Sequence, residues 1–87
     1  PARAMPTVHV TYISSFRPAL GGAESLQIQA KTLRELMGKI LRKYPRMQKH
    51  LETGVAVAID GEIYRDDWDL EIPEGVEGYL MPRSQGG

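Results

Sequence analysis

The sequence predicts an α+β domain in which one main helix packs on one face of a mixed sheet of four to five strands. Three features predict this fold class: two alternating strands early in the chain, an amphipathic helix after them, and a second group of strands after the helix. The 87 residues make only one domain, because a second hydrophobic core would need roughly 50 more residues.

The first two strands are predicted from apolar residues at every second position. This alternation extends over residues 8–13 and again over 25–30, which is the pattern of a strand with one face toward a core. Pro18 and Gly21-Gly22 lie between them and are typical of a loop. Two consecutive strands joined by a loop most economically form an antiparallel hairpin.

The clearest element is a helix over residues 33–44. Thr32 and Glu35 have the spacing of a capping box, which satisfies free backbone N–H groups at a helix start. Pro45 ends the helix, because its ring cannot sit in the interior of a continuing helix. One apolar stripe runs along it, formed by Leu33, Leu36, Met37, Ile40, Leu41 and Tyr44.

The second half of the chain supplies the remaining strands. Residues 45–54 are predicted to be a connection with one short turn. The apolar run 55–59 predicts a buried strand, and Asp60-Gly61 is a two-residue turn that returns residues 62–64 alongside it. Residues 76–81 are the last predicted strand. The predicted elements follow the order of a ubiquitin-like β-grasp fold: strand, strand, helix, strand, short strand, strand. In that fold the first and last strands pair at the centre of the sheet.

The two ends of the chain differ from this body. Residues 1–6 are predicted to be a flexible lead-in to a β-grasp domain over residues 7–82. Residues 83–87 have no hydrophobic period, so we expect a flexible, extended C-terminal diglycine tail.

Composition argues against several classes of function. The absence of cysteine excludes disulfides, thiolate metal sites and a cysteine nucleophile, and it fits a cytoplasmic location. No apolar run approaches the roughly 20 residues of a membrane span. His9 and His50 have no hydroxyl or carboxylate at a catalytic spacing. A calcium loop starting at Asp67 would need glycine and glutamate where the chain has Ile72 and Gly78. We therefore expect no bound metal or cofactor and no catalytic residue.

Charge is divided unevenly along the chain. Residues 1–50 hold nine Lys or Arg and two acids, whereas residues 51–87 hold nine acids and two arginines. Such asymmetry either steers a charged partner or reflects two solvated faces. No aromatic residues are interleaved with the basic residues of the helix, and the pI is near 7.3, so we expect no nucleic-acid partner.

Gly86-Gly87 points to chemistry at the chain end. Five extended residues reach at most about 18 Å, so a terminal carboxylate can enter an enzyme channel while the body stays outside. Two residues without side chains let the channel walls close on the backbone. A carboxylate is a poor electrophile, but attachment of AMP turns it into an anhydride that a sulfur or nitrogen nucleophile can attack.

Several motifs together indicate a family. They are the strand and turn 55–61, the Asp67-Trp68 pair, the turn 73–77, Pro82, and Gly86-Gly87. In these residues the chain resembles the MoaD/ThiS family of ubiquitin-like sulfur carrier proteins, over nearly the whole domain from about Thr7. Its length is closer to that of MoaD-like members.

The resemblance implies a carrier protein and its partners. An ATP-dependent activating enzyme of the MoeB/ThiF kind would use Mg-ATP to adenylate Gly87. A sulfur donor such as a cysteine desulfurase or rhodanese would convert it to a thiocarboxylate. The sulfur would pass to an acceptor enzyme or synthase subunit in a molybdopterin, thiazole, cysteine or siderophore type of pathway. The resemblance places four residues in the activating-enzyme channel and three in partner docking: Gly86, Gln85, Ser84 and Arg83 in the channel, and Phe16, Tyr79 and Met81 in docking.

The chain departs from the family pattern at three places. Val76 replaces a usual acid, Gly78 a usual hydrophobe, and Arg83-Ser84-Gln85 a proline with small apolar residues. The pathway and the activating enzyme therefore stay open. Arg83 near the diglycine also resembles ubiquitin-type modifiers. Two alternatives remain: a modifier conjugated to lysines through Gly87, and a non-covalent ubiquitin-like binding domain.

Overall fold

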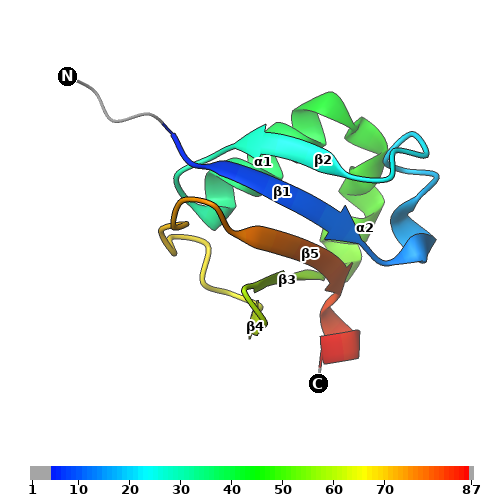
Figure 1. The fold of residues 1–87 in the computed structure, drawn as a ribbon. Coiled ribbons are helices and arrows are strands. Elements are labelled where there is room, and N and C mark those ends of the chain that lie inside the picture. Colours follow the sequence, from blue (N-terminus) through cyan, green and yellow to red (C-terminus); the bar gives the residue numbers. More distant parts are fainter. Residues whose placement is uncertain (1–4, 87) are drawn as a thin grey trace.

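The computed structural model describes residues 5–86, which form one five-stranded sheet with helices on one side (Figure 1). The strands are β1 (Thr7–Tyr12), β2 (Leu26–Gln29), β3 (Val55–Ile59), β4 (Glu62–Tyr64) and β5 (Glu77–Pro82). The helices are α1 (Leu33–Lys43) and α2 (Gln48–Thr53), with short 3-10 helices η1 (Ser14–Phe16), η2 (Pro45–Met47) and η3 (Arg83–Gly86).

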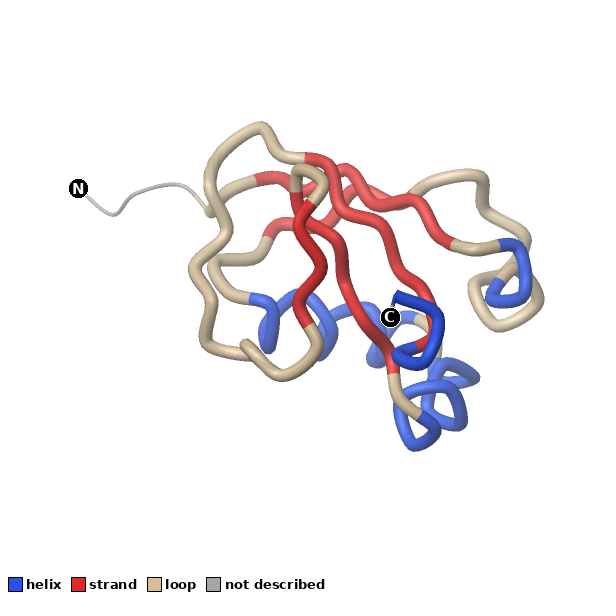
Figure 2. The backbone as a smooth tube through the Cα atoms, turned by 90° about the horizontal axis from the view of Figure 1, so that it is seen from below, coloured by secondary structure: helices blue, strands red, loops and turns tan. Residues whose placement is uncertain are grey.

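The sheet is mixed and has the order β2-β1-β5-β3-β4. β5 lies at its centre, parallel to β1 and antiparallel to β3, and the two outer pairs are antiparallel. Seen from below, α1 and α2 lie on the same side of the strands (Figure 2). The predicted mixed sheet, with its first and last strands paired at the centre, is confirmed.

The main helix begins where the capping residues predicted. The hydroxyl of Thr32 accepts a hydrogen bond from the backbone N–H of Glu35 at 3.2 Å. The Glu35 carboxylate reaches back to the N–H of Lys31 at 2.7 Å, one residue earlier than in the usual capping box. The helix ends at Lys43, next to Tyr44 and Pro45.

The core lies between α1 and the inner face of the sheet. The apolar stripe of α1 contributes four buried residues, and every strand except β4 contributes others. The largest side chains with almost no exposure include Phe16, Leu36, Ile40, Met47 and Leu80.

The structure differs from the sequence prediction at two connections. Residues 45–54 contain a second helix, α2, where only a short turn was predicted. Met47 is buried beneath it, as expected, and Gly54 ends it with φ +121°. At the start of the chain, Pro6 is buried and its carbonyl accepts a hydrogen bond from Ala30 N–H at 3.0 Å, so Pro6 belongs to the body rather than to the lead-in. Residues 1–4 of that lead-in lie outside the described residues.

The turn between β3 and β4 fixes the register of this sheet edge. Asp60 and Gly61 both have positive φ, +50° and +86°, as a type I′ turn requires. Ala58 therefore lies opposite Ile63, and Ile59 lies opposite Glu62. The predicted hairpin is confirmed.

Candidate functional site

The candidate site begins where β5 leaves the sheet. Pro82, the last residue of β5, pairs with Val55, and the next backbone N–H, that of Arg83, donates to the carbonyl of Gly54 at 2.9 Å. Gly54 is required here on two grounds. Its φ of +121° is a conformation that side chains rarely adopt, and a Cβ would lie 3.1 Å from the Cβ of Arg83. One backbone hydrogen bond beyond the last β3–β5 pair therefore ties Arg83, the first residue of η3, to the end of the sheet.

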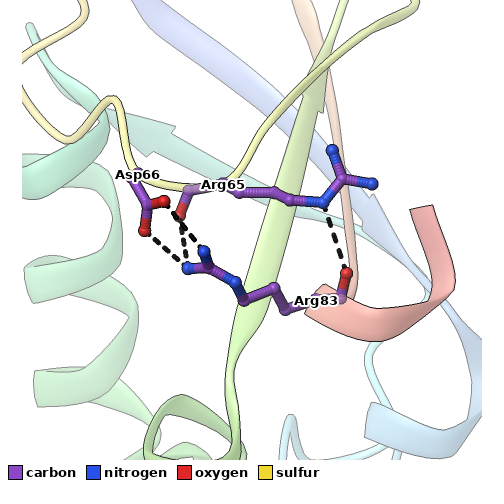
Figure 3. Close-up of polar contacts among 3 residues, drawn as sticks. All are labelled: Arg65, Asp66 and Arg83. Carbon is purple, nitrogen blue, oxygen red and sulfur yellow. Dashed lines mark hydrogen bonds and ion pairs between the residues drawn. The ribbon is translucent and has the colours of Figure 1, made fainter. Parts of the chain in front are cut away.

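The side chain of Arg83 turns back toward the loop that follows β4 (Figure 3). Its guanidinium donates to both carboxylate oxygens of Asp66, at 2.5 and 2.8 Å, and to the Arg65 carbonyl at 3.4 Å. The Arg65 side chain runs in the opposite direction, and its Nε donates to the Arg83 carbonyl at 3.4 Å. Arg83 is therefore bound through its N–H, its carbonyl and its guanidinium.

The two-point contact with Arg83 changes the acidity of Asp66. The Arg83 guanidinium holds the pKa of the Asp66 carboxyl below its ordinary value, chiefly by hydrogen bonding, and the charges of Arg83 and Arg65 act in the same direction. The same contact raises the pKa of Arg83. Both side chains are substantially exposed, so solvent screens the pair and its share of the free energy of unfolding is small.

This shift predicts a pH dependence. A carboxyl whose pKa is lowered by folding contributes stability above the ordinary aspartate pKa and loses it as the pH falls through the lowered value. We expect a carboxyl NMR titration to show Asp66 titrating at lower pH in the wild type than in Arg83→Gln. Arg34→Gln is the matched control, because Arg34 pairs with Asp69 at 3.2 Å instead. An Asp66 midpoint that is the same in Arg83→Gln and wild type would contradict the contact.

The predicted channel residues follow Arg83 directly. Arg83–Gly86 form η3, so this stretch is a 3-10 turn and is not extended as the sequence predicted. Arg83 is held on the body, and the backbone of the short polar segment after it closes a local turn. Arg83 and Ser84 are exposed. Gln85 and Gly86 lie in the turn, and Gly87 lies outside the described residues.

The docking residues do not lie together. Tyr79 is on the outer face of the sheet and is 38% exposed, and Met81 is on the same face and half-buried. Phe16 is 2% exposed and packs against the ring of His50, with 4.6 Å between ring centroids. Phe16 is therefore a core residue and offers no side chain for docking, which corrects the expectation from the sequence.

Tyr79 has an exposed apolar neighbour, Ile63, that was not predicted from the sequence. Ile63 is 36% exposed on β4, and Ala58 of β3 lies opposite both Ile63 and Tyr79. Thr11 of β1 pairs with Tyr79 on its other side. We call Tyr79, Ala58 and Ile63 the outer patch, which is an apolar row across three strands. The type I′ turn at Asp60-Gly61 was the signal that could have placed Ile63 in it.

Residues 5–86 offer neither a metal site nor a membrane-spanning helix. In that part of the chain, no group of three or more His, Asp or Glu residues is arranged to hold a metal ion. None of its helices has the length and apolar character needed to cross a membrane.

Comparison with known proteins gives matches in structure only. No family model and no curated protein matches this chain. Small archaeal modifier protein 1 from Methanosarcina acetivorans matches with a TM-score of 0.77 and 18% identity, over 98% of this chain and 100% of that one. A putative molybdopterin converting factor subunit 1 from Pyrococcus furiosus matches with a TM-score of 0.73 and 22% identity, over 88% of this chain and 97% of that one. CysO from Mycobacterium tuberculosis matches with a TM-score of 0.73 and 19% identity, over 86% of this chain and 97% of that one.

This chain has the β-grasp fold of these proteins. The predicted fold class is confirmed, and so is the resemblance to the MoaD/ThiS family at the level of the fold. Two further matches come from complexes. One is the BexX/CysO complex from Amycolatopsis orientalis, with a TM-score of 0.73, 18% identity, and coverage of 92% and 99%. The other is the complex of subunits 1 and 2 of molybdopterin-converting factor from Helicobacter pylori. It matches with a TM-score of 0.66 and 22% identity, over 87% of this chain and 92% of that one.

Proposed function

We propose that this protein is a ubiquitin-like sulfur carrier of the MoaD/ThiS type, a carrier and not an enzyme, with Gly87 as its site of covalent chemistry. The observation that carries the proposal is the course of β5. The central strand of a β-grasp sheet ends at Pro82 and continues directly into the segment that leads to Gly86-Gly87. The matches to a molybdopterin converting factor subunit and to CysO support this role.

The chemistry has three steps, and all of them take place at the Gly87 carboxyl group. On the activating enzyme, a carboxylate oxygen attacks the α-phosphate of Mg-ATP, an O–P bond forms, and pyrophosphate leaves. The outer sulfur of a persulfide on the donor, a cysteine desulfurase or a rhodanese, then attacks the carbonyl carbon, AMP leaves, and an acyl disulfide joins Gly87 to the donor. A reducing thiol attacks the donor-side sulfur of this S–S bond, which releases the Gly87 thiocarboxylate and leaves a disulfide on the donor. One terminal oxygen is thereby replaced by sulfur, which an acceptor enzyme or synthase subunit later takes up.

The carrier's own residues position the reacting group. To enter a channel, η3 must unwind, because a 3-10 turn rises only about 2.0 Å per residue, against about 3.3–3.6 Å when extended. Gly86 and Gly87 have no side chains, so channel walls can close on their backbone. Gln85, Ser84 and Arg83 line the way from the body to the channel.

The outer patch is the surface that we assign to partner docking. It presents apolar side chains beside the strand that leads to the tail, so a partner bound there also reaches the chain end. Tyr79 and Ile63 would lie at the centre of this contact, with Met81 toward the tail. The solved complexes of CysO and of molybdopterin-converting factor support a partner protein.

The match to small archaeal modifier protein 1 favours a second candidate function. A modifier uses the same adenylate, but a lysine amine of another protein attacks the carbonyl carbon in place of sulfur. The product is an isopeptide bond through Gly87. Both functions need the same fold and the same chain end, so the product distinguishes them.

The experiment that tests the proposal is an intact-mass measurement. The protein is incubated with an ATP-dependent activating enzyme from the same organism, Mg-ATP and a sulfur donor. A sulfur carrier shows one exchange of oxygen for sulfur, located to the C-terminal peptide. Substitution of Lys31, Lys39, Lys43 or Lys49 should leave this exchange unchanged.

The other outcomes identify the alternatives. A modifier would yield adducts on lysines of other proteins that resist thiol reagents. A non-covalent binding domain would yield neither product, and its affinity for a partner would survive loss of both glycines. That last result, obtained with a proven activating enzyme, would refute the proposed function.

A further inference from the structure

We propose that Arg65 and Asp66 form a clamp on Arg83 that fixes the point at which the C-terminal segment leaves the body. Its effect at Gly87 rests on the proposed function, whereas the clamp itself is a property of the fold. In this arrangement Arg65 and Asp66 are positioning residues for the chain end.

The clamp holds each polar part of Arg83 separately. Gly54 accepts from the Arg83 N–H, Arg65 donates to the Arg83 carbonyl, and Asp66 accepts from the guanidinium at two points (Figure 3). A two-point contact between arginine and a carboxylate fixes orientation as well as distance. The backbone direction at Arg83 is therefore set from three sides.

The loop that carries Arg65 and Asp66 is itself fixed to the body. The backbone N–H of Arg34 donates to the carbonyl of Trp68 at 2.8 Å, and that of Leu33 donates to Leu70 at 3.2 Å. These two donors belong to the first turn of α1, where a helix leaves its N–H groups without partners. Trp68 also packs against the core, so the clamp is mounted on the start of the main helix.

The clamp changes the reach of the chain end. If the segment were free from Pro82, five residues would span at most about 18 Å to Gly87, but with Arg83 held only four remain, or about 14 Å. The segment also starts in one direction instead of many. The segment therefore loses less conformational entropy when it enters the channel of a partner enzyme.

Trypsin offers a direct test, because it cleaves after arginine. To cut the Arg83–Ser84 bond, the protease must take the Arg83 guanidinium and its flanking backbone, and the clamp holds both. We expect Asp66→Asn to raise the initial rate of cleavage at Arg83 by roughly two- to fivefold, the range typical of an exposed ion pair. Intact-mass measurement follows the loss of the residues after Arg83.

Asp67→Asn is the matched control. It removes the same charge from the next residue, and among the described residues the Asp67 side chain makes no hydrogen bond or ion pair with Arg83. Its cleavage at Arg83 should match that of the wild type. Cleavage at the basic residues other than Arg65 and Arg83 should be nearly equal in all three proteins, and so should the melting temperature, since a general loss of stability would speed every site. Arg65 is left out of this comparison because Asp66 and Asp67 follow it directly and affect its own cleavage.

A second measurement extends the test to function. With the activating enzyme, Asp66→Asn should raise the KM for the carrier severalfold with little change in kcat, while Asp67→Asn behaves as wild type. Equal tryptic rates for Asp66→Asn and wild type would refute the clamp whatever the function. Faster cleavage of Asp66→Asn, combined with no adenylation of any variant, would refute the proposed function and leave the clamp standing.

Discussion

Deletion of Gly87 is expected to reduce thiocarboxylate formation by at least about 100-fold. The clamp fixes the start of the segment at Arg83, so losing one residue withdraws the carboxylate by up to about 3.6 Å. Attack on the α-phosphate requires the reacting atoms to approach within roughly 3–3.5 Å, and even a 1 Å error costs about 100-fold. The measurement is the initial rate of sulfur incorporation, followed by intact mass.

Two matched variants separate length from composition. Ser84→Ala keeps the length and both glycines and removes only a hydroxyl from a channel residue, so its rate should fall far less than that of the Gly87 deletion. Gly87→Ala keeps the length but adds a methyl group, and it should be slower if the channel closes on the backbone. A Gly87 deletion that incorporates sulfur as fast as Ser84→Ala would show that chemistry does not depend on this residue.

The parts of the fold that were predictable from sequence are those set by neighbours along the chain. The alternation over 8–13, the cap at Thr32 and the Asp60-Gly61 turn each determine a local conformation, and each agrees with the structure. The missed helix α2 has only six residues, too few to show a clear apolar stripe. Its signals were Pro45 before it and Gly54 after it, the residues that commonly flank a helix.

The parts that were not predictable depend on residues distant in sequence. Arg65 and Asp66 are separated from Arg83 by 18 and 17 residues and meet it only because β5 passes beside β3. Phe16 follows a strand and precedes a loop, a position that does not distinguish a docking residue from a core residue. Its burial is decided by contacts such as that with His50, on the far side of α1 in sequence.

The outer patch leads to the last prediction, which concerns partner binding. Tyr79→Asp is expected to weaken binding of the activating enzyme at least about tenfold, because an interface would bury a carboxylate in place of a large aromatic side chain. Ile63→Asp, at the other end of the row, should have a similar effect. Isothermal titration calorimetry measures both dissociation constants. Phe16 is unsuitable for this test, since a charge in the core would unfold the protein.

Gln27→Asp is the matched control for these two variants. Gln27 is exposed on β2 and lies opposite His9, on the same outer face as Tyr79 but outside the apolar row. The substitution adds the same charge to the same face, so a general electrostatic effect would appear in all three variants, whereas a docking effect appears only at Tyr79 and Ile63. Thermal melts establish that each variant is folded at the temperature of the titration. If Tyr79→Asp and Ile63→Asp are folded and bind as tightly as Gln27→Asp, partners dock on another surface.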